Sequence, residues 1–106
     1  MAFPNPHRVI TVSPREKVVV WSMEVPSGMV AFIDKLYVPY HPNLKITMRI
    51  DSTERIIERQ IGEVNKPEEY DPPIVSEGII EITAENVGTT TMTVEVVCDG
   101  YLIPID

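Results

Sequence analysis

The chain is 106 residues long, a length that suits one domain and leaves no room for two. Its ten prolines argue against long helices and favour short strands joined by turns. Sixteen acidic residues against nine scattered basic ones give a net charge of −7. This balance excludes nucleic acid as the expected ligand, because phosphate backbones are bound by clustered Lys and Arg.

The N-terminal half alternates between apolar and polar residues with a period of two, the pattern of strands that bury one face. Residues 1–8 contain Pro4 and Pro6 and are predicted to be an extended arm before a β-domain of residues 9–106. A Pro-Ser-Gly turn at residues 26–28 is expected between the second strand and the third. The predicted strands of this half cover residues 9–12, 17–25, 29–38 and 44–50.

The C-terminal half continues the alternation after one ambiguous segment. Residues 55–61 fit a strand or an amphipathic helix, and we favour a strand because strands flank the segment. Residues 62–73 carry three prolines and four carboxylates and are predicted to be an exposed loop. Asp99 and Gly100 are expected to form a turn before the last strand. The remaining predicted strands cover residues 74–75, 79–84, 90–98 and 101–105.

These seven to nine strands predict an all-β, single-domain antiparallel β-sandwich that is jelly-roll-like. Cys98, the only cysteine, lies in an apolar run and is expected to be a buried, unreactive thiol in a reducing compartment. No apolar segment has the length of a membrane span, and residues 1–8 lack the pattern of a signal peptide. The predicted core comprises Val19, Trp21, Met23, Ile46, Met48, Ile80, Ile82, Val94 and Val96.

Few residues with catalytic or metal-binding chemistry stand at useful spacings. His7 and His41 share no predicted strand, so we expect no transition-metal site. A Gly-x-Ser-x-Gly turn and a Gly-rich phosphate loop are both absent, and we expect a protein that is not an enzyme and has no cofactor. The carboxylates of residues 68–71 are interpreted as a solvated acidic loop, with a calcium site as the alternative.

Four tyrosines are candidates for a platform on which a sugar would stack: Tyr37, Tyr40, Tyr70 and Tyr101. Two of them, Tyr40 and Tyr70, stand in predicted loops, and acidic side chains accompany Tyr70. The candidate ligand-facing loop residues are therefore Tyr40, Glu68, Tyr70 and Asp71.

The strand over residues 29–38 has more apolar side chains than one sandwich core can use, which predicts contact with another copy. We expect a homo-oligomer, first a trimer and second a dimer, in which the arm of residues 1–8 clasps a neighbour. The candidate contact residues are Phe3, Pro4, Met29, Ala31, Ile33 and Tyr37.

Several short segments carry a resemblance to a known family. A strand ends in Val-Pro-Ser-Gly at residues 25–28 and the next strand follows at once. Residues 73–78 (Pro-Ile-Val-Ser-Glu-Gly) precede another strand, and the last strand runs into Asp-Gly-Tyr-Leu-Ile at residues 99–103. From residue 18 to residue 105 this order resembles small jelly-roll virion proteins of tailed phages, such as capsid decoration and head-fibre accessory proteins.

The resemblance implies a non-catalytic, often trimeric protein that binds a capsid or fibre, with no catalytic residues to carry over. It implies a location in the virion if a phage encodes the chain, and we expect the cytoplasm otherwise. The residues themselves leave open an alternative, a carbohydrate- or receptor-binding β-sandwich module. No membrane partner is expected.

Overall fold

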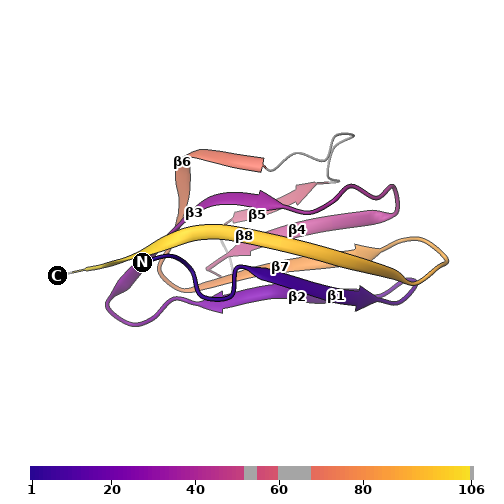
Figure 1. Ribbon diagram of the computed structural model, residues 1–106, viewed down its shortest axis with the longest axis horizontal. Coiled ribbons are helices and arrows are strands. Elements are labelled where there is room, and N and C mark those ends of the chain that lie inside the picture. The colour runs from indigo at the N-terminus through magenta and orange to yellow at the C-terminus, as the bar shows by residue number, and fades with distance from the viewer. Residues whose placement is uncertain (52–54, 60–67, 106) are drawn as a thin grey trace.

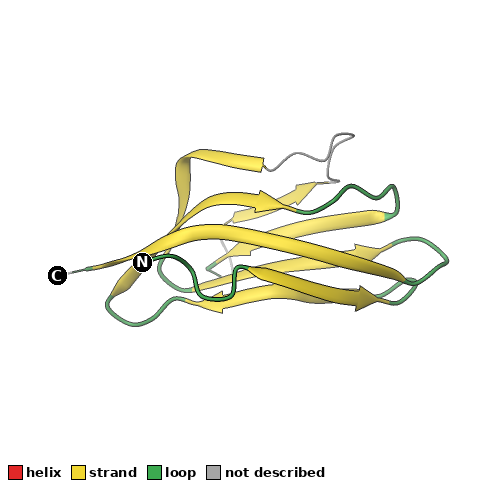
Figure 2. Ribbon diagram, in the orientation of Figure 1, coloured by secondary structure: helices red, strands yellow, loops and turns green. Residues whose placement is uncertain are grey.

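The computed structural model describes residues 1–51, 55–59 and 68–105, and in them it contains strands and turns but no helix (Figures 1 and 2). None of these residues therefore belongs to a helix that is long and apolar enough to cross a membrane. The strands are β1 (His7–Val12), β2 (Lys17–Glu24), β3 (Met29–Tyr37), β4 (Leu44–Ile50), β5 (Arg55–Arg59), β6 (Glu68–Ser76), β7 (Ile79–Asn86) and β8 (Met92–Pro104).

The eight strands form two antiparallel sheets of four strands each, in the orders β1-β8-β3-β6 and β2-β7-β4-β5. Successive strands cross from one sheet to the other, apart from the β4–β5 pair. This arrangement is a jelly roll, so the predicted all-β sandwich of seven to nine strands is confirmed. The molecule is elongated, 49 × 24 × 23 Å, and both chain termini lie at the same end (Figure 1).

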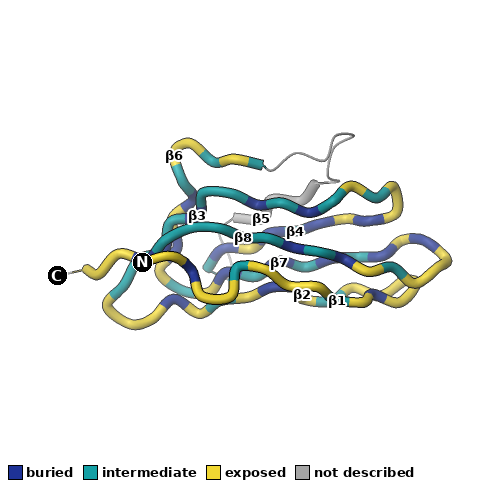
Figure 3. Tube along the Cα trace, in the orientation of Figure 1, coloured by how far each residue is buried: buried dark blue, intermediate teal, exposed yellow. Residues whose placement is uncertain are grey.

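The core fills the space between the two sheets, where buried and less buried residues alternate along the strands (Figure 3). The predicted core residues Trp21, Ile46, Met48, Ile80, Ile82, Val94 and Val96 are buried, and Met23 packs against them.

Val19 was predicted to lie in the core, but its side chain is 44% exposed. The pairing of β2 with β7 shifts between Val19 and Trp21, so Val20 is the extra residue of a β-bulge. The bulge turns both Val20 and Trp21 inward and leaves Val19 on the outer face. Strict alternation counted back from Trp21 therefore gives the wrong face for Val19.

The predicted turn at Asp99 and Gly100 is wrong, because β8 runs through both residues without interruption. Gly100 is required there for close packing. A Cβ at this position would lie 2.1 Å from the carbonyl oxygen of Phe32 and 2.6 Å from the Phe3 ring. The glycine thus makes room for an aromatic side chain instead of making a turn.

The N-terminal residues, predicted as an extended arm over residues 1–8, lie against the chain's own domain. Ala2 pairs with Tyr101, and the Phe3 N–H donates to the Gly100 carbonyl at 3.1 Å. Phe3 itself is only 4% exposed, and its ring lies 6.1 Å from that of Trp21. Residues 7 and 8, which the prediction assigned to the arm, already belong to β1.

The predicted loop of residues 62–73 is wrong for its second half, which lies in a strand. The ambiguous run at 55–61 is a strand over Arg55–Arg59, as favoured, and residues 60–67 lie outside the described part of the chain. Residues 68–73, however, belong to β6: Glu68 and Glu69 pair with β3, which resumes its pairing with β6 at Ile74. The residues between these two pairings include the cis peptide bond Asp71–Pro72.

We predict that Trp21→Ala lowers the free energy of unfolding by about 3–5 kcal/mol, because it empties the volume of a buried aromatic side chain. Val19→Ala, only two residues away, is expected to change it by no more than about 0.5 kcal/mol, because Val19 lies outside the core. Urea unfolding followed by far-UV circular dichroism measures both. Equal losses for the two variants would contradict the bulge at Val20.

Candidate functional site

The predicted oligomer contacts fall in different environments. Phe3, Ala31 and Ile33 are buried in the core of their own domain, so in this fold their side chains offer no surface to a neighbour. Met29 and Tyr37 are half-buried, and Pro4 is exposed. The apolar character of β3 therefore has two parts: one face builds the core, and the other faces outward.

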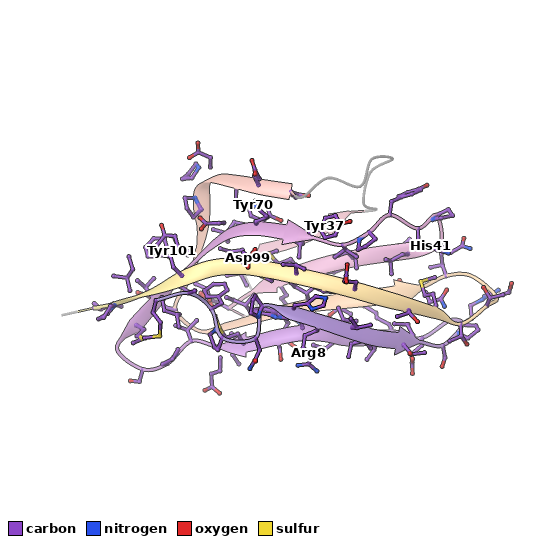
Figure 4. All side chains as sticks on the ribbon, viewed as in Figure 1. Arg8, Tyr37, His41, Tyr70, Asp99 and Tyr101 are labelled. Atoms are coloured by element: carbon purple, nitrogen blue, oxygen red, sulfur yellow. The ribbon has the colours of Figure 1, made fainter. Side chains whose placement is uncertain are left out.

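The four tyrosines do not form one platform. Tyr101 stacks on Phe32, whereas Tyr37 lies five residues further along β3, about 16 Å away at ~3.3 Å per residue. Figure 4 shows Tyr101 toward the end with the chain termini and Tyr37 further toward the opposite end. Tyr70 packs against the core and Tyr40 lies in the β3–β4 connection.

The acidic residues predicted to face a ligand are placed along β6. Glu68 and Glu69 pair with Leu36 and Lys35 of β3, and Asp71 is exposed. In the residues that the structure describes, no three His, Cys, Asp or Glu side chains stand close enough to hold a metal ion.

The outer face of the β2-β7-β4-β5 sheet is polar. Glu85 of β7 lies between Lys17 of β2 and Lys45 of β4. A second cross-strand row places Glu81 beside Arg49. Opposite charges in neighbouring strands attract one another and remain hydrated, so this face is suited to solvent.

The outer face of the β1-β8-β3-β6 sheet is different, because apolar and aromatic side chains stand beside one another on it. The register places Phe32 of β3 directly between Val75 of β6 and Tyr101 of β8, and Val30 opposite Ile103. We call these five residues the aromatic patch. Residues directly opposite in antiparallel strands point to the same side, so the patch is continuous across three strands.

Within the aromatic patch the rings of Phe32 and Tyr101 stack, with centroids 5.1 Å apart and planes 14° from parallel. Val75 and Ile103 keep 49% and 43% of their surface exposed. Next to the patch, Lys35 lies between Glu69 and Asp99 on the same face. Together they form an apolar centre with a charged border, which is the usual composition of a protein interface.

Val30, Phe32, Val75 and Ile103 were not among the candidate site residues. The signal for Val30 and Phe32 was the largely apolar character of residues 29–38, which indicated a second buried face. The sequence alone could not show which residues of β6 and β8 extend that face, because cross-strand register is a property of the folded sheet.

Three titratable groups outside the patch, those of Cys98, His7 and His41, are either buried or in contact with other groups of the fold. Burial, and to a lesser extent the charge of Asp99, raise the pKa of the Cys98 thiol to about 12, so it remains protonated and a poor nucleophile near neutral pH. His7 Nε2 lies 3.0 Å from Glu95 Oε2 on an exposed part of the same sheet as the patch. His41 Nδ1 accepts from the Asn43 N–H in the β3–β4 connection.

Asp51 joins the end of β4 to the β6–β7 turn. Its Oδ1 accepts from Ser76 Oγ at 2.5 Å and from the Gly78 N–H at 2.9 Å, and its Oδ2 accepts from the Glu77 N–H at 3.3 Å. Partial burial alone would raise the pKa of this carboxyl. The hydrogen bonds from Ser76 and from backbone groups outweigh it and lower the pKa below the ordinary 3.8. The carboxylate therefore holds a turn in place.

Neither the family models nor the curated proteins with which we compared the sequence match it.

We predict that Asp51→Asn lowers the free energy of unfolding by about 1–3 kcal/mol at pH 7, because the turn loses hydrogen bonds to a charged group. The lowered pKa means that the stabilisation is fully present above the unfolded-state value and is lost as the pH falls through the folded-state value. Urea unfolding from pH 7 downward should therefore show the wild type and the variant converging only below about pH 4. A difference independent of pH would contradict the role of the charge.

Proposed function

We propose that the protein is a non-catalytic structural protein of a virus particle, an accessory protein of the capsid decoration or head-fibre type. In this proposal it assembles as a small homo-oligomer, a trimer first and a dimer second. One observation carries the assembly. Among the residues that the structure describes, an aromatic patch lies on the outer face of the β1-β8-β3-β6 sheet, whereas the outer face of the other sheet carries cross-strand pairs of opposite charge. The proposed place in a virion is supported in addition by the resemblance of residues 18–105 to small jelly-roll virion proteins of tailed phages.

The edges of the sheets favour contact through a face. Arg8 on edge strand β1 lies opposite buried Val96 but is exposed at the open edge of the sheet, where its charge opposes addition of another strand. Edge strand β6 contains Pro72 and Pro73, which have no N–H to donate, and edge strand β2 contains the bulge at Val20. Association by strand pairing is therefore disfavoured at three edges, and the aromatic patch is the better candidate.

The stacked rings bear on the alternative of a carbohydrate-binding module. A sugar packs its C–H groups on an open aromatic face, but Phe32 and Tyr101 each cover one face of the other. Such a pair offers mainly ring edges and neighbouring aliphatic groups to a partner. These groups suit close packing against another protein surface better than stacking against a sugar.

We predict that the full-length protein is oligomeric and that Phe32→Lys shifts it toward the monomer, because the variant places a charge in the centre of the aromatic patch. Light scattering after size exclusion at about 50 µM, a concentration above the Kd of a specific complex, measures the mass. Thr83→Lys, on the polar outer face, is the matched control and should leave the mass unchanged. A monomeric wild type would overturn the assembly.

The virion assignment predicts that the protein is present in purified particles of the virus that encodes it, at a copy number set by the capsid or fibre symmetry. Quantitative mass spectrometry of particles washed in high salt, with the major capsid protein as the internal standard, measures that number. Loss of the protein from particles that retain the capsid protein would contradict it. So would binding to a defined glycan on an array that is abolished by Tyr101→Ala, which would support the binding-module alternative.

A further inference from the structure

We propose that copies of the protein also associate end to end, with one end of each molecule seated on the opposite end of the next. The two ends are defined by the turns that form them. The terminal end comprises residue 1 and residues 24–29, 76–79 and 103–105. The far end comprises residues 13–17, 39–45 and 85–91. They are separated along the 49 Å axis of the molecule, as Figure 1 shows.

Exposed apolar side chains gather at the terminal end. Of the nine large hydrophobic residues that are exposed in the described part of the chain, four belong to it, and Val75 of the aromatic patch adjoins it. The four are Met1, Ile79, Ile103 and Ile105. Hydrogen bonds hold them together: the Ile105 N–H donates to the Gly28 carbonyl at 2.8 Å and the Val25 N–H to the Gly78 carbonyl at 2.7 Å. The apolar surface therefore has a fixed shape.

The two ends carry opposite charge. Glu24 and Glu77 are exposed at the terminal end, where the Met1 ammonium is the one positive group among the described residues assigned to this end. At the far end Arg15, Lys17 and Lys45 outnumber Glu16 and Glu85, and the Glu16 carboxylate already accepts from the Ser13 N–H. The far end also exposes apolar surface, on Tyr40 and Val87.

This complementarity selects the far end of a second copy as the occupant. Two terminal ends placed together would bring the carboxylates of Glu24 and Glu77 against their own copies, which is unfavourable. The terminal end against a far end instead pairs acidic with basic groups around apolar centres. Such a head-to-tail contact does not close on itself, so it extends into a linear array.

The size of the ends sets the strength of the contact. A cross-section of 24 × 23 Å offers about 550 Å² per copy, or about 1,100 Å² in total, which is at the low end of specific interfaces. We therefore expect a weak association that depends on concentration and is reduced by salt, because the pairing groups are solvent-exposed.

A charge-swap experiment tests the contact. Sedimentation velocity from about 10 µM to about 1 mM covers the Kd range expected of a weak interface. The wild type should gain mass with concentration and lose most of that gain in ~1 M NaCl. Glu77→Lys and Arg15→Glu should each abolish the gain, and an equimolar mixture of the two variants should restore it, since each variant then meets a complementary end.

Val19→Lys is the matched control, because it adds a positive charge midway along the polar face and should leave the gain intact. Native-like circular dichroism of each variant shows that it folds. A wild-type mass independent of concentration, or a mixture that behaves as the sum of its separate variants, would overturn the proposal. The Phe32→Lys variant tests the aromatic patch separately, by the mass of the closed oligomer at low concentration, because Phe32 belongs to the patch and not to the terminal end. Failure of one contact is therefore distinguishable from failure of the other.

Discussion

The pairing of β8 along both of its edges is the constraint on which the rest of the structure depends. β1 pairs with its first half, and the residues that precede β1 continue along its second half, where the Leu102 N–H donates to the Met1 carbonyl at 2.7 Å. β3 pairs with the other edge from Val97 to Pro104. Because Gly100 has no side chain, Phe3 can lie against the strand and reach Trp21. This pairing brings both chain termini to one end and sets Tyr101 opposite Phe32.

Two bulges then decide what the outer faces present. The extra residue Val20 in β2 shifts by one residue which side chains face outward. After it, Ser22 and Glu24 lie on the outer face beside β7. In β3 the pairing with both neighbours shifts between Ile33 and Lys35. Asp34 is the extra residue relative to β8, whereas on the side of β6 the longer insertion is residues 70–73 of β6 itself. Before this bulge the outer face is aromatic, and after it Lys35 lies between two carboxylates. A single inserted residue thus marks the boundary between the aromatic patch and its charged border.

The local patterns of the sequence were sufficient to predict the β-sandwich. Alternation gave both ends of β4 correctly and placed Trp21, Ile82 and Val96 in the core. They failed where a long-range contact overrode a local signal. The pair Asp99-Gly100 is typical of a turn in sequence. In the fold it is extended, because β8 pairs with β3 there and Phe3 packs against Gly100. The prolines of β6 predicted a loop, but Glu68 and Glu69 pair with β3 and extend the strand. The patch could be inferred only as a surplus of apolar residues on β3, because its other members depend on register.

The two contacts that we propose lie in different directions, and the charge of the molecule gives each a separate reason. A chain with a net charge of −7 repels its own copies, so a contact between equivalent surfaces is best made where charge is absent. The five residues of the aromatic patch carry none, and the patch lies along the side of the molecule. A contact between unlike surfaces can use charge, and the acidic terminal end and the basic far end supply it along the long axis. Apart from Ile103, which belongs to both surfaces, copies joined through the patch therefore leave their ends open to another layer.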